Sequence, residues 1–197
     1  HVMNQVARME WSVDSIRSAL AMDSMLFGED AYRMMFVTNH DENSWNGTIA
    51  ERMGANGDAM AMLAGTLFGM PLVYSGQEAG ISKRLRFFEK DTVIWGDYSK
   101  TNLYQTINAL HHDEEALWNG PFGGWPELIP TDFSDEVVAW KRTKGVSEVV
   151  VASNFGNENR MVAVGIDTTY AIAWGDIEPA GQVEVPAHQT LVWKKKP

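Results

Sequence analysis

The order of apolar and polar residues predicts alternating helices and strands in the first part of the chain. Apolar residues recur at helical spacing in three segments, 13–27, 48–68 and 101–118. Between these segments lie two compact apolar runs, Arg33–Thr38 and Met70–Tyr74, which are typical of strands buried on both faces of a parallel sheet. The alternation predicts right-handed strand–helix–strand units on such a sheet.

Chain-breaking residues refine the limits of these helices. Asn56 and Gly57 interrupt the second helical segment, so we expect a kink or a break there. The turn Gly28–Asp30 follows the first segment, and we expect its glycine to end that helix.

The pattern changes at Asn119–Gly124, a cluster of chain-breaking residues. Beyond it the apolar residues alternate with polar ones in the short segments 137–141, 149–153, 161–166, 182–185 and 190–193. Short strands separated by Gly, Asn, Asp and Pro are typical of a small antiparallel β-sandwich. We therefore predict an α/β domain in residues 1–118 and an all-β domain in residues 119–197.

Two parallel strands are too few for a stable sheet, because each buried strand needs neighbours that pair its backbone groups. A (β/α)8 barrel needs about 250 residues, and residues 1–118 would hold about its last two strand–helix units. The chain also begins at His1, without an initiator Met or the basic and apolar layout of a signal peptide. We expect it to be a piece of a longer protein.

The composition narrows the classes of partner and cofactor. The chain has 16 Lys and Arg against 26 Asp and Glu, a net charge of −10, so nucleic acid is not an expected partner. The absence of cysteine excludes disulfides and thiolate metal sites. The longest apolar stretch, Ala59–Tyr74, is interrupted by Gly, Thr and Pro and falls short of the roughly 20 residues that span a bilayer. We therefore expect no membrane segment.

Polar residues follow both apolar runs, where parallel α/β proteins collect their functional side chains. Asn39–Asn43 follows the first run and Ser75–Glu78 follows the second. His40 offers a donor for substrate hydroxyls, and Asp41 beside it offers a carboxylate that stabilises positive charge. This pairing suits sugar chemistry, although the same residues also fit a polar loop start without a catalytic role.

Two of these segments resemble motifs of the alpha-amylase family of glycoside hydrolases. Phe36–Asp41 resembles the motif at the end of the seventh barrel strand, and Gly69–Glu78 resembles the eighth-strand motif, with its Gly-x-Pro start and Gly-Gln-Glu end. The stretches 41–47 and 87–91 look most like bacterial members. The resemblance covers essentially the whole chain and implies the barrel's sixth helix, its last two strand–helix units and the C-terminal domain.

The resemblance implies a retaining hydrolase that cleaves α-glucosidic bonds in starch-like glucans or maltooligosaccharides. Such an enzyme uses an Asp nucleophile, a Glu general acid/base and a further Asp that stabilises the developing charge. Only the last of these maps onto this chain, at Asp41, with His40 contacting sugar hydroxyls. A retaining pair stands about 5–5.5 Å apart across the scissile bond, and it belongs to strands absent from this sequence. We expect the chain by itself to be inactive.

Other residues near the predicted strand ends have weaker cases. Glu42 adjoins Asp41, so its side chain is expected to point elsewhere, and Glu78 is expected to anchor the eighth-strand loop. Trp45 is the best candidate for a platform on which a sugar ring stacks. Arg84 and Arg86 either touch substrate or close the barrel rim.

Further aromatic and acidic residues are expected to be structural. The segment His111–Glu115 contains possible metal ligands, but adjacent helical residues point about 100° apart, so we expect a solvated helix face. The tryptophans on periodic elements are expected in the core; these are Trp118, Trp140, Trp174 and Trp193.

The resemblance implies calcium as a cofactor of complete relatives, and we expect no metal site within this chain. The expected partner is the glucan substrate, and an exposed barrel edge is expected to favour self-association. The compartment stays open, with export to the periplasm or the medium slightly favoured. An alternative function is a catalytically dead relative that binds or chaperones a partner. The intact His40 and Asp41 argue against it, and a free-standing sugar-binding sandwich conflicts with the attached α/β part.

Overall fold

A computed structural model describes residues 1–28 and 31–197. The first part of the chain contains α1 (Val2–Ala7), α2 (Asp14–Phe27), β1 (Met34–Met35), a π-helical turn η1 (Glu42–Asn46), α3 (Ile49–Met53), a 3-10 turn η2 (Gly54–Asn56), α4 (Gly57–Thr66), β2 (Met70–Pro71) and α5 (Thr101–Asp113). Two 3-10 turns follow, η3 (Glu115–Leu117) and η4 (Gly120–Phe122). The strands of the second part are β3 (Glu127–Ile129), β4 (Val137–Lys144), β5 (Ser147–Asn154), β6 (Arg160–Ala163), β7 (Tyr170–Trp174), β8 (Gln182–Val185) and β9 (Gln189–Lys195).

The helices agree with the apolar pattern, including the break in the second one. Segment 13–27 forms α2, and Gly28 follows it with a φ of 68°, a backbone conformation that glycine adopts at little cost. The rest of the predicted turn, Glu29 and Asp30, lies outside the described residues. Segment 48–68 is divided at residues 54–56 into α3 and α4. Thr48 begins α3 through a capping box with Glu51.

The strands β1 and β2 pair in parallel, with Met34 opposite Met70, as the strand–helix–strand pattern predicts. Both are shorter than the apolar runs that contain them. Met70 N donates to Arg33 O at 2.7 Å and Leu72 N donates to Met35 O at 2.8 Å. Among the described residues no further strand pairs with either one, so the ladder ends after these contacts.

The second part consists of antiparallel sheets, in agreement with the period-two pattern. The strand order is β3-β4-β5-β9-β7 in the larger sheet, and β6 pairs with β8 separately. The sequence did not predict helix α1, strands β3 and β7, or the helical turns η1 and η4. Conversely, the helix expected over 101–118 ends at Asp113, and a 3-10 turn continues it.

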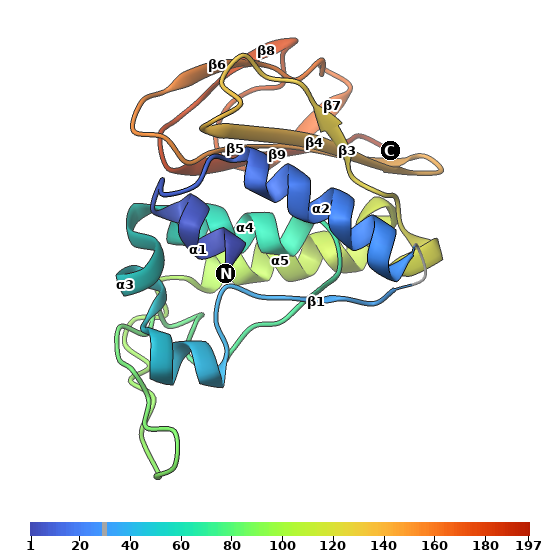
Figure 1. The fold of residues 1–197 in the computed structure, drawn as a ribbon. Coiled ribbons are helices and arrows are strands. Elements are labelled where there is room, and N and C mark those ends of the chain that lie inside the picture. The colour runs from blue at the N-terminus through green and yellow to red at the C-terminus, as the bar shows by residue number, and fades with distance from the viewer. Residues whose placement is uncertain (29–30) are drawn as a thin grey trace.

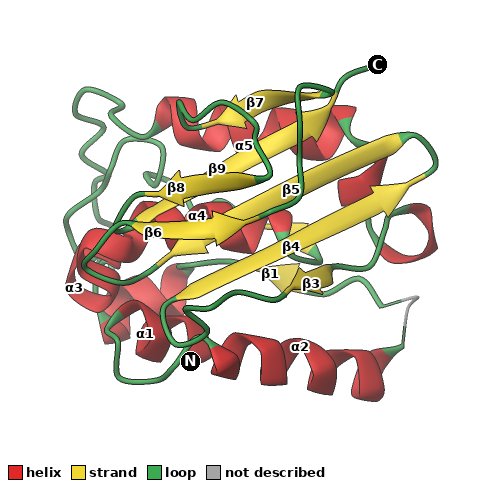
Figure 2. Ribbon diagram, turned by 90° about the horizontal axis from the view of Figure 1, so that it is seen from above, coloured by secondary structure: helices red, strands yellow, loops and turns green. Residues whose placement is uncertain are grey.

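The larger sheet is buried on both faces. Val138, Trp140 and Val151 pack with the helices, while Val137 and Val150 pack with residues of β6 and β8. Figure 1 shows this sheet lying over α2, α4 and α5, with β1 on the opposite side of the helices. Figure 2 shows β6 and β8 in front of the larger sheet when it is seen from above.

The predicted core tryptophans are only partly found in the core. Trp140 and Trp193 are fully buried, and Trp174 packs against the core. Trp118 is exposed, so that prediction is wrong, because the chain has left the helical stripe before this residue. His111 also differs from the predicted solvated face: its ring lies against the Gly65 carbonyl, and burial lowers its pKa.

A buried arginine ties the connector to the sheet and to the end of α4. The Arg142 guanidinium donates to the carbonyls of Gly124 at 2.7 Å, Trp118 at 2.8 Å and Thr66 at 3.4 Å. Burial lowers its pKa to about 10. These contacts pack the α/β part firmly against the sheet, and the division into domains at residue 119 stays a prediction.

Candidate functional site

The residues that follow β1 form a helical turn rather than an open loop. The Asn39 side-chain oxygen accepts a hydrogen bond from Glu42 N at 2.8 Å, and Asn43 N donates to Asn39 O at 2.9 Å. This is the way in which an asparagine begins a helix. The turn carries His40 and Asp41 at the carboxyl end of β1, where the sequence predicts functional side chains.

His40 and Asp41 lie together and face solvent. The distance from His40 Nε2 to Asp41 Oδ2 is 3.6 Å, and the two side chains are 66% and 58% exposed. Within the part of the chain that the structure describes, no other residue covers these two side chains fully, so a ligand can reach both. Their contact with a substrate stays a prediction.

Trp45 belongs to an aromatic cluster, which we define as Trp45, Phe87 and Phe88. The ring centroids of Trp45 and Phe87 are 5.2 Å apart, and those of Phe87 and Phe88 are 4.8 Å apart. The Phe87 ring also stacks on His40, with centroids 5.8 Å apart and an angle of 27° between the planes. The cluster therefore adjoins the His40 and Asp41 pair.

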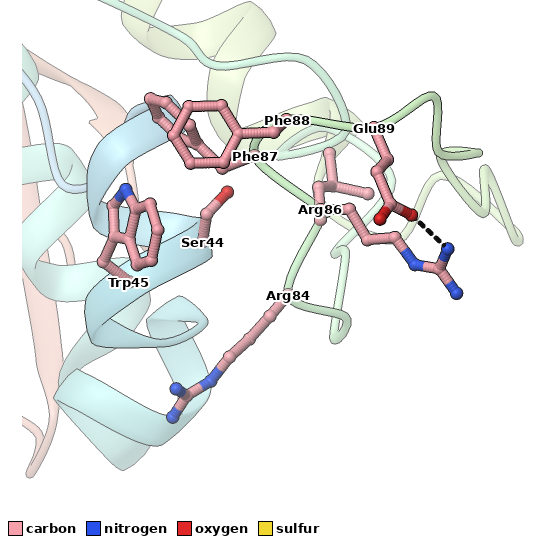
Figure 3. Close-up of a pocket in the computed structure, with 8 residues that line it drawn as sticks. Ser44, Trp45, Arg84, Arg86, Phe87, Phe88 and Glu89 are labelled. Carbon is pink, nitrogen blue, oxygen red and sulfur yellow. Dashed lines mark hydrogen bonds and ion pairs between the residues drawn. The ribbon is translucent and has the colours of Figure 1, made fainter.

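A pocket of about 610 Å³ lies beside this cluster, between η1 and the loop that follows β2. It is lined by Ser44, Trp45, Arg84, Leu85, Arg86, Phe87, Phe88 and Glu89. Figure 3 shows Trp45 and the two phenylalanines facing one another, whereas Arg84 points away from them. The volume lies within the roughly 300–1,000 Å³ of small-molecule sites.

Asn43 joins the two segments that carry the aromatic rings. Its buried amide donates to Lys83 O at 3.2 Å and accepts from Leu85 N at 2.7 Å. Both polar ends of this side chain are thus used, which fixes the loop against η1. The contact holds together the two segments that carry Trp45 and Phe87.

Arg52 fixes the other side of the same turn. Its buried guanidinium donates to Val37 O at 2.7 Å, Gly47 O at 2.8 Å and Glu42 Oε2 at 3.2 Å. Burial lowers the pKa of this group, and the neighbouring Glu42 carboxylate opposes that change. The arginine therefore holds the end of β1 and both ends of η1 in one arrangement.

The remaining carboxylates at this edge have protein partners. Glu42 pairs with Arg52 at 3.2 Å, and Glu78 accepts a hydrogen bond from Gly76 N at 3.1 Å within its own loop. These contacts indicate that Glu42 and Glu78 stabilise the local fold.

The two arginines considered as substrate ligands are also paired. Arg84 contacts the Glu51 carboxylate at 2.9 Å, and Arg86 contacts Glu89 at 2.6 Å. The pKa of Glu51 is lowered to about 2, first because Arg84 hydrogen-bonds to it. These pairs favour a role in shaping the loop.

Sequence reasoning missed Asn43, Phe87 and Phe88 as parts of this site. Two adjacent phenylalanines among charged residues are a usable signal, because polar loops seldom carry exposed rings without a partner. Asn43 gave no such signal, since its partners are backbone atoms of Lys83 and Leu85.

The described residues contain no group of three or more His, Asp or Glu side chains arranged to hold a metal ion. Whether the complete protein uses calcium, as the resemblance implies, stays a prediction. None of the helices in the described ranges is both long and apolar enough to cross a membrane.

Comparisons with known proteins relate the chain as a whole to known enzymes. No family model matches the chain. Alpha-amylase MalA of Haloarcula japonica is 32% identical over 146 residues, which are 72% of this chain and 21% of that protein. The chain thus spans about a fifth of the length of this curated relative.

Solved structures show the same fold over nearly the whole chain. A noncanonic maltogenic alpha-amylase, AmyB, from Thermotoga neapolitana has a TM-score of 0.73 at 18% identity, over 97% of this chain and 47% of that one. An alpha-amylase from Lactobacillus plantarum has a TM-score of 0.74 at 16% identity, over 98% of this chain and 45% of that one. These structures show the shared fold, and the sequence match to an alpha-amylase shows that the chain belongs to the alpha-amylase family of glycoside hydrolases, in which it fits a C-terminal part.

Proposed function

We propose that residues 1–118 close the (β/α)8 barrel of a glycoside hydrolase and that residues 119–197 form its C-terminal β-domain. The parallel pairing of β1 with β2, with α3 and α4 between them, supports this placement. The side chains of Met34 and Met70 on these strands are exposed. In this proposal other barrel strands cover them in the complete enzyme.

In this proposal Asp41 stabilises the positive charge that develops on the sugar during cleavage of an α-glucosidic bond. His40 donates to hydroxyls of the same sugar, and Trp45 stacks against a neighbouring ring. The observation that carries the proposal is the exposed pair of His40 and Asp41, 3.6 Å apart at a strand end. A carboxylate placed beside the developing positive charge lowers the barrier by electrostatic stabilisation of the transition state.

The nucleophile and the proton donor come from other barrel strands in this account. Glu42 is engaged by Arg52 and Glu78 by its own loop, so neither is free for these tasks. The substrates are starch-like glucans or maltooligosaccharides, and the chain alone is inactive. Calcium, where the complete enzyme uses it, is held outside these residues.

The test is the Asp41→Asn substitution in the complete enzyme, assayed on maltooligosaccharides. We expect kcat to fall roughly 100- to 1,000-fold, the scale measured for the loss of one transition-state contact. Asp176→Asn, an exposed residue of the β-domain, is the matched control and leaves kcat unchanged. An unaltered kcat in Asp41→Asn removes Asp41 from the mechanism. A complete protein that binds glucan without cleaving it supports the binding or chaperoning alternative.

A further inference from the structure

We propose that the aromatic cluster of Trp45, Phe87 and Phe88 is a subsite for a neutral sugar ring, with Phe88 as its stacking surface. This inference rests on the proposed function, because it places the subsite beside the sugar that His40 and Asp41 hold. It adds two residues, Phe87 and Phe88, to the substrate-binding surface.

The exposure of the rings is the first observation. Phe88 is 84% exposed and Trp45 is 57% exposed, and because the three rings adjoin one another they form a contiguous apolar patch, the kind of surface that marks a binding site. The rings touch edge to face, with 6.0 Å between the centroids of Trp45 and Phe88, so part of each face stays open. A glucose ring presents C–H groups on its faces and hydroxyls at its edge, which suits an aromatic face with polar groups around it.

The charges of the pocket are the second observation. Arg84 donates to both oxygens of Glu51, at 2.9 and 3.1 Å. Arg86 pairs with Glu89 at 2.6 Å (Figure 3). The cations that line the pocket are therefore already balanced by carboxylates. An anionic ligand would have to displace one of these pairs, whereas a neutral ligand leaves both in place.

The third observation links the cluster to the reacting sugar. Phe87 stacks on His40 and also contacts both Trp45 and Phe88. A glucan that places one unit at His40 and Asp41 therefore runs past the pocket with its adjoining unit. Phe87 is the inner ring of the cluster and Phe88 the outer one, which is why we assign the stacking contact to Phe88.

The loop that carries Phe88 is held in place before any ligand binds. Asn43 fixes it at Lys83 and Leu85. Asp91 closes it through Lys83 and through hydrogen bonds from Arg86 N at 3.1 Å and Thr92 N at 2.8 Å. A preformed surface of this kind loses little conformational freedom on binding.

The experiment compares Phe88→Leu, Phe88→Tyr and the parent in the complete enzyme, with maltopentaose as the probe. Leucine keeps an apolar side chain but removes the ring face. We expect KM to rise roughly threefold to tenfold, the equivalent of one aromatic contact, while kcat changes less than about twofold. Phe88→Tyr restores the parent KM. Phe122→Leu, which alters an exposed phenylalanine of the connector, is the matched control and leaves KM unchanged.

The outcomes separate this inference from the proposed function. A parent-like KM in Phe88→Leu, together with loss of turnover in Asp41→Asn, overturns the subsite and leaves the function standing. Full turnover in Asp41→Asn overturns the function. Binding of maltopentaose that depends on Phe88, in a complete protein that cleaves nothing, supports the subsite and overturns the hydrolase proposal.

Discussion

Asn43 and Leu85 are joined by a hydrogen bond of 2.7 Å, from the Leu85 amide to the buried Asn43 side chain. They are 42 residues apart in the chain, one just beyond β1 and the other beyond β2. The same side chain donates to Lys83 O. One amide thus sets the distance between the turn that carries Asp41 and the loop that carries Phe87.

Asn43→Asp is expected to loosen this loop. The carboxylate of this variant would still accept from Leu85 N, but it cannot donate to Lys83 O. A carboxylate oxygen then faces the Lys83 carbonyl oxygen in a buried position, which lowers the stability by roughly 1–3 kcal/mol. Trypsin should then cut after Arg84 and Arg86 faster than in the parent, as followed by mass spectrometry. Asn46→Asp, on the exposed side of the same turn, is the control. Equal cutting rates in parent and Asn43→Asp would contradict the assigned role.

Arg52→Met is expected to be strongly destabilising. The substitution leaves Glu42 and the carbonyls of Val37 and Gly47 without their donor. Removing one partner of a buried ion pair costs roughly 3–5 kcal/mol, which denaturant unfolding of the complete protein measures. Arg86→Met, which breaks an exposed pair with Glu89, should cost at most about 1 kcal/mol. A similar cost for both variants would show that Arg52 is not the anchor.

Glu51 is expected to make the stability depend on pH in acid. Its folded pKa is lowered from 4.5 to about 2, chiefly by the hydrogen bonds from Arg84. A lowered folded pKa means that the stabilisation is present above about pH 4.5 and is lost as the pH falls toward 2. Melting temperatures of parent and Glu51→Gln should therefore differ at pH 6 and converge near pH 2.

Two points complete this test. Lys83 lowers the pKa of Asp91 in the same direction, so Glu51→Gln removes only part of the acid dependence. Glu178→Gln changes an exposed glutamate for which the described residues provide no ion pair, and it should melt like the parent at every pH. If the difference in melting temperature between the parent and Glu51→Gln stayed constant down to pH 2, the lowered pKa assigned to Glu51 would be refuted.

The chain by itself is expected to associate with copies of itself. Met25 and Leu26 of α2 and Met34 of β1 are exposed apolar residues, and in the proposed barrel we expect the other strands and helices to cover them. The apparent molecular mass of the chain in a sizing experiment should therefore grow as the protein concentration is raised. Met25→Lys with Leu26→Lys should reduce it, whereas Val146→Lys, on the exposed β4–β5 turn, should not. A compact monomer at all concentrations would count against the proposed barrel edge.

The sequence predicted the elements with strong periodicity and missed those that depend on distant partners. Strand β8 appears at the predicted residues, and the break in the second helix lies at residues 54–56, slightly before the predicted Asn56 and Gly57, because Gly57 already begins α4. Strand β7 was missed because its residues, Tyr170–Trp174, show no alternation, and it is defined by its pairing with β9. The pairing of the two strands followed from the pattern, although β1 ends at Met35 rather than Thr38 and β2 at Pro71 rather than Tyr74. His40 and Asp41 lie beyond β1, and their role stays a prediction. Asn43 and Arg52 could not be found in this way, because both bind backbone atoms that only the fold brings near.

The central claim is that Asp41 stabilises positive charge on a glucose ring, and a pair of binding constants tests it most directly. In the complete enzyme, the affinity for a maltooligosaccharide analogue with a protonated ring nitrogen is compared with that for uncharged maltotriose, in parent and Asp41→Asn. The account predicts that the substitution weakens binding of the cation roughly 100-fold or more and changes maltotriose binding less than about threefold. Equal losses for the two ligands, or no loss for the cation, would contradict it.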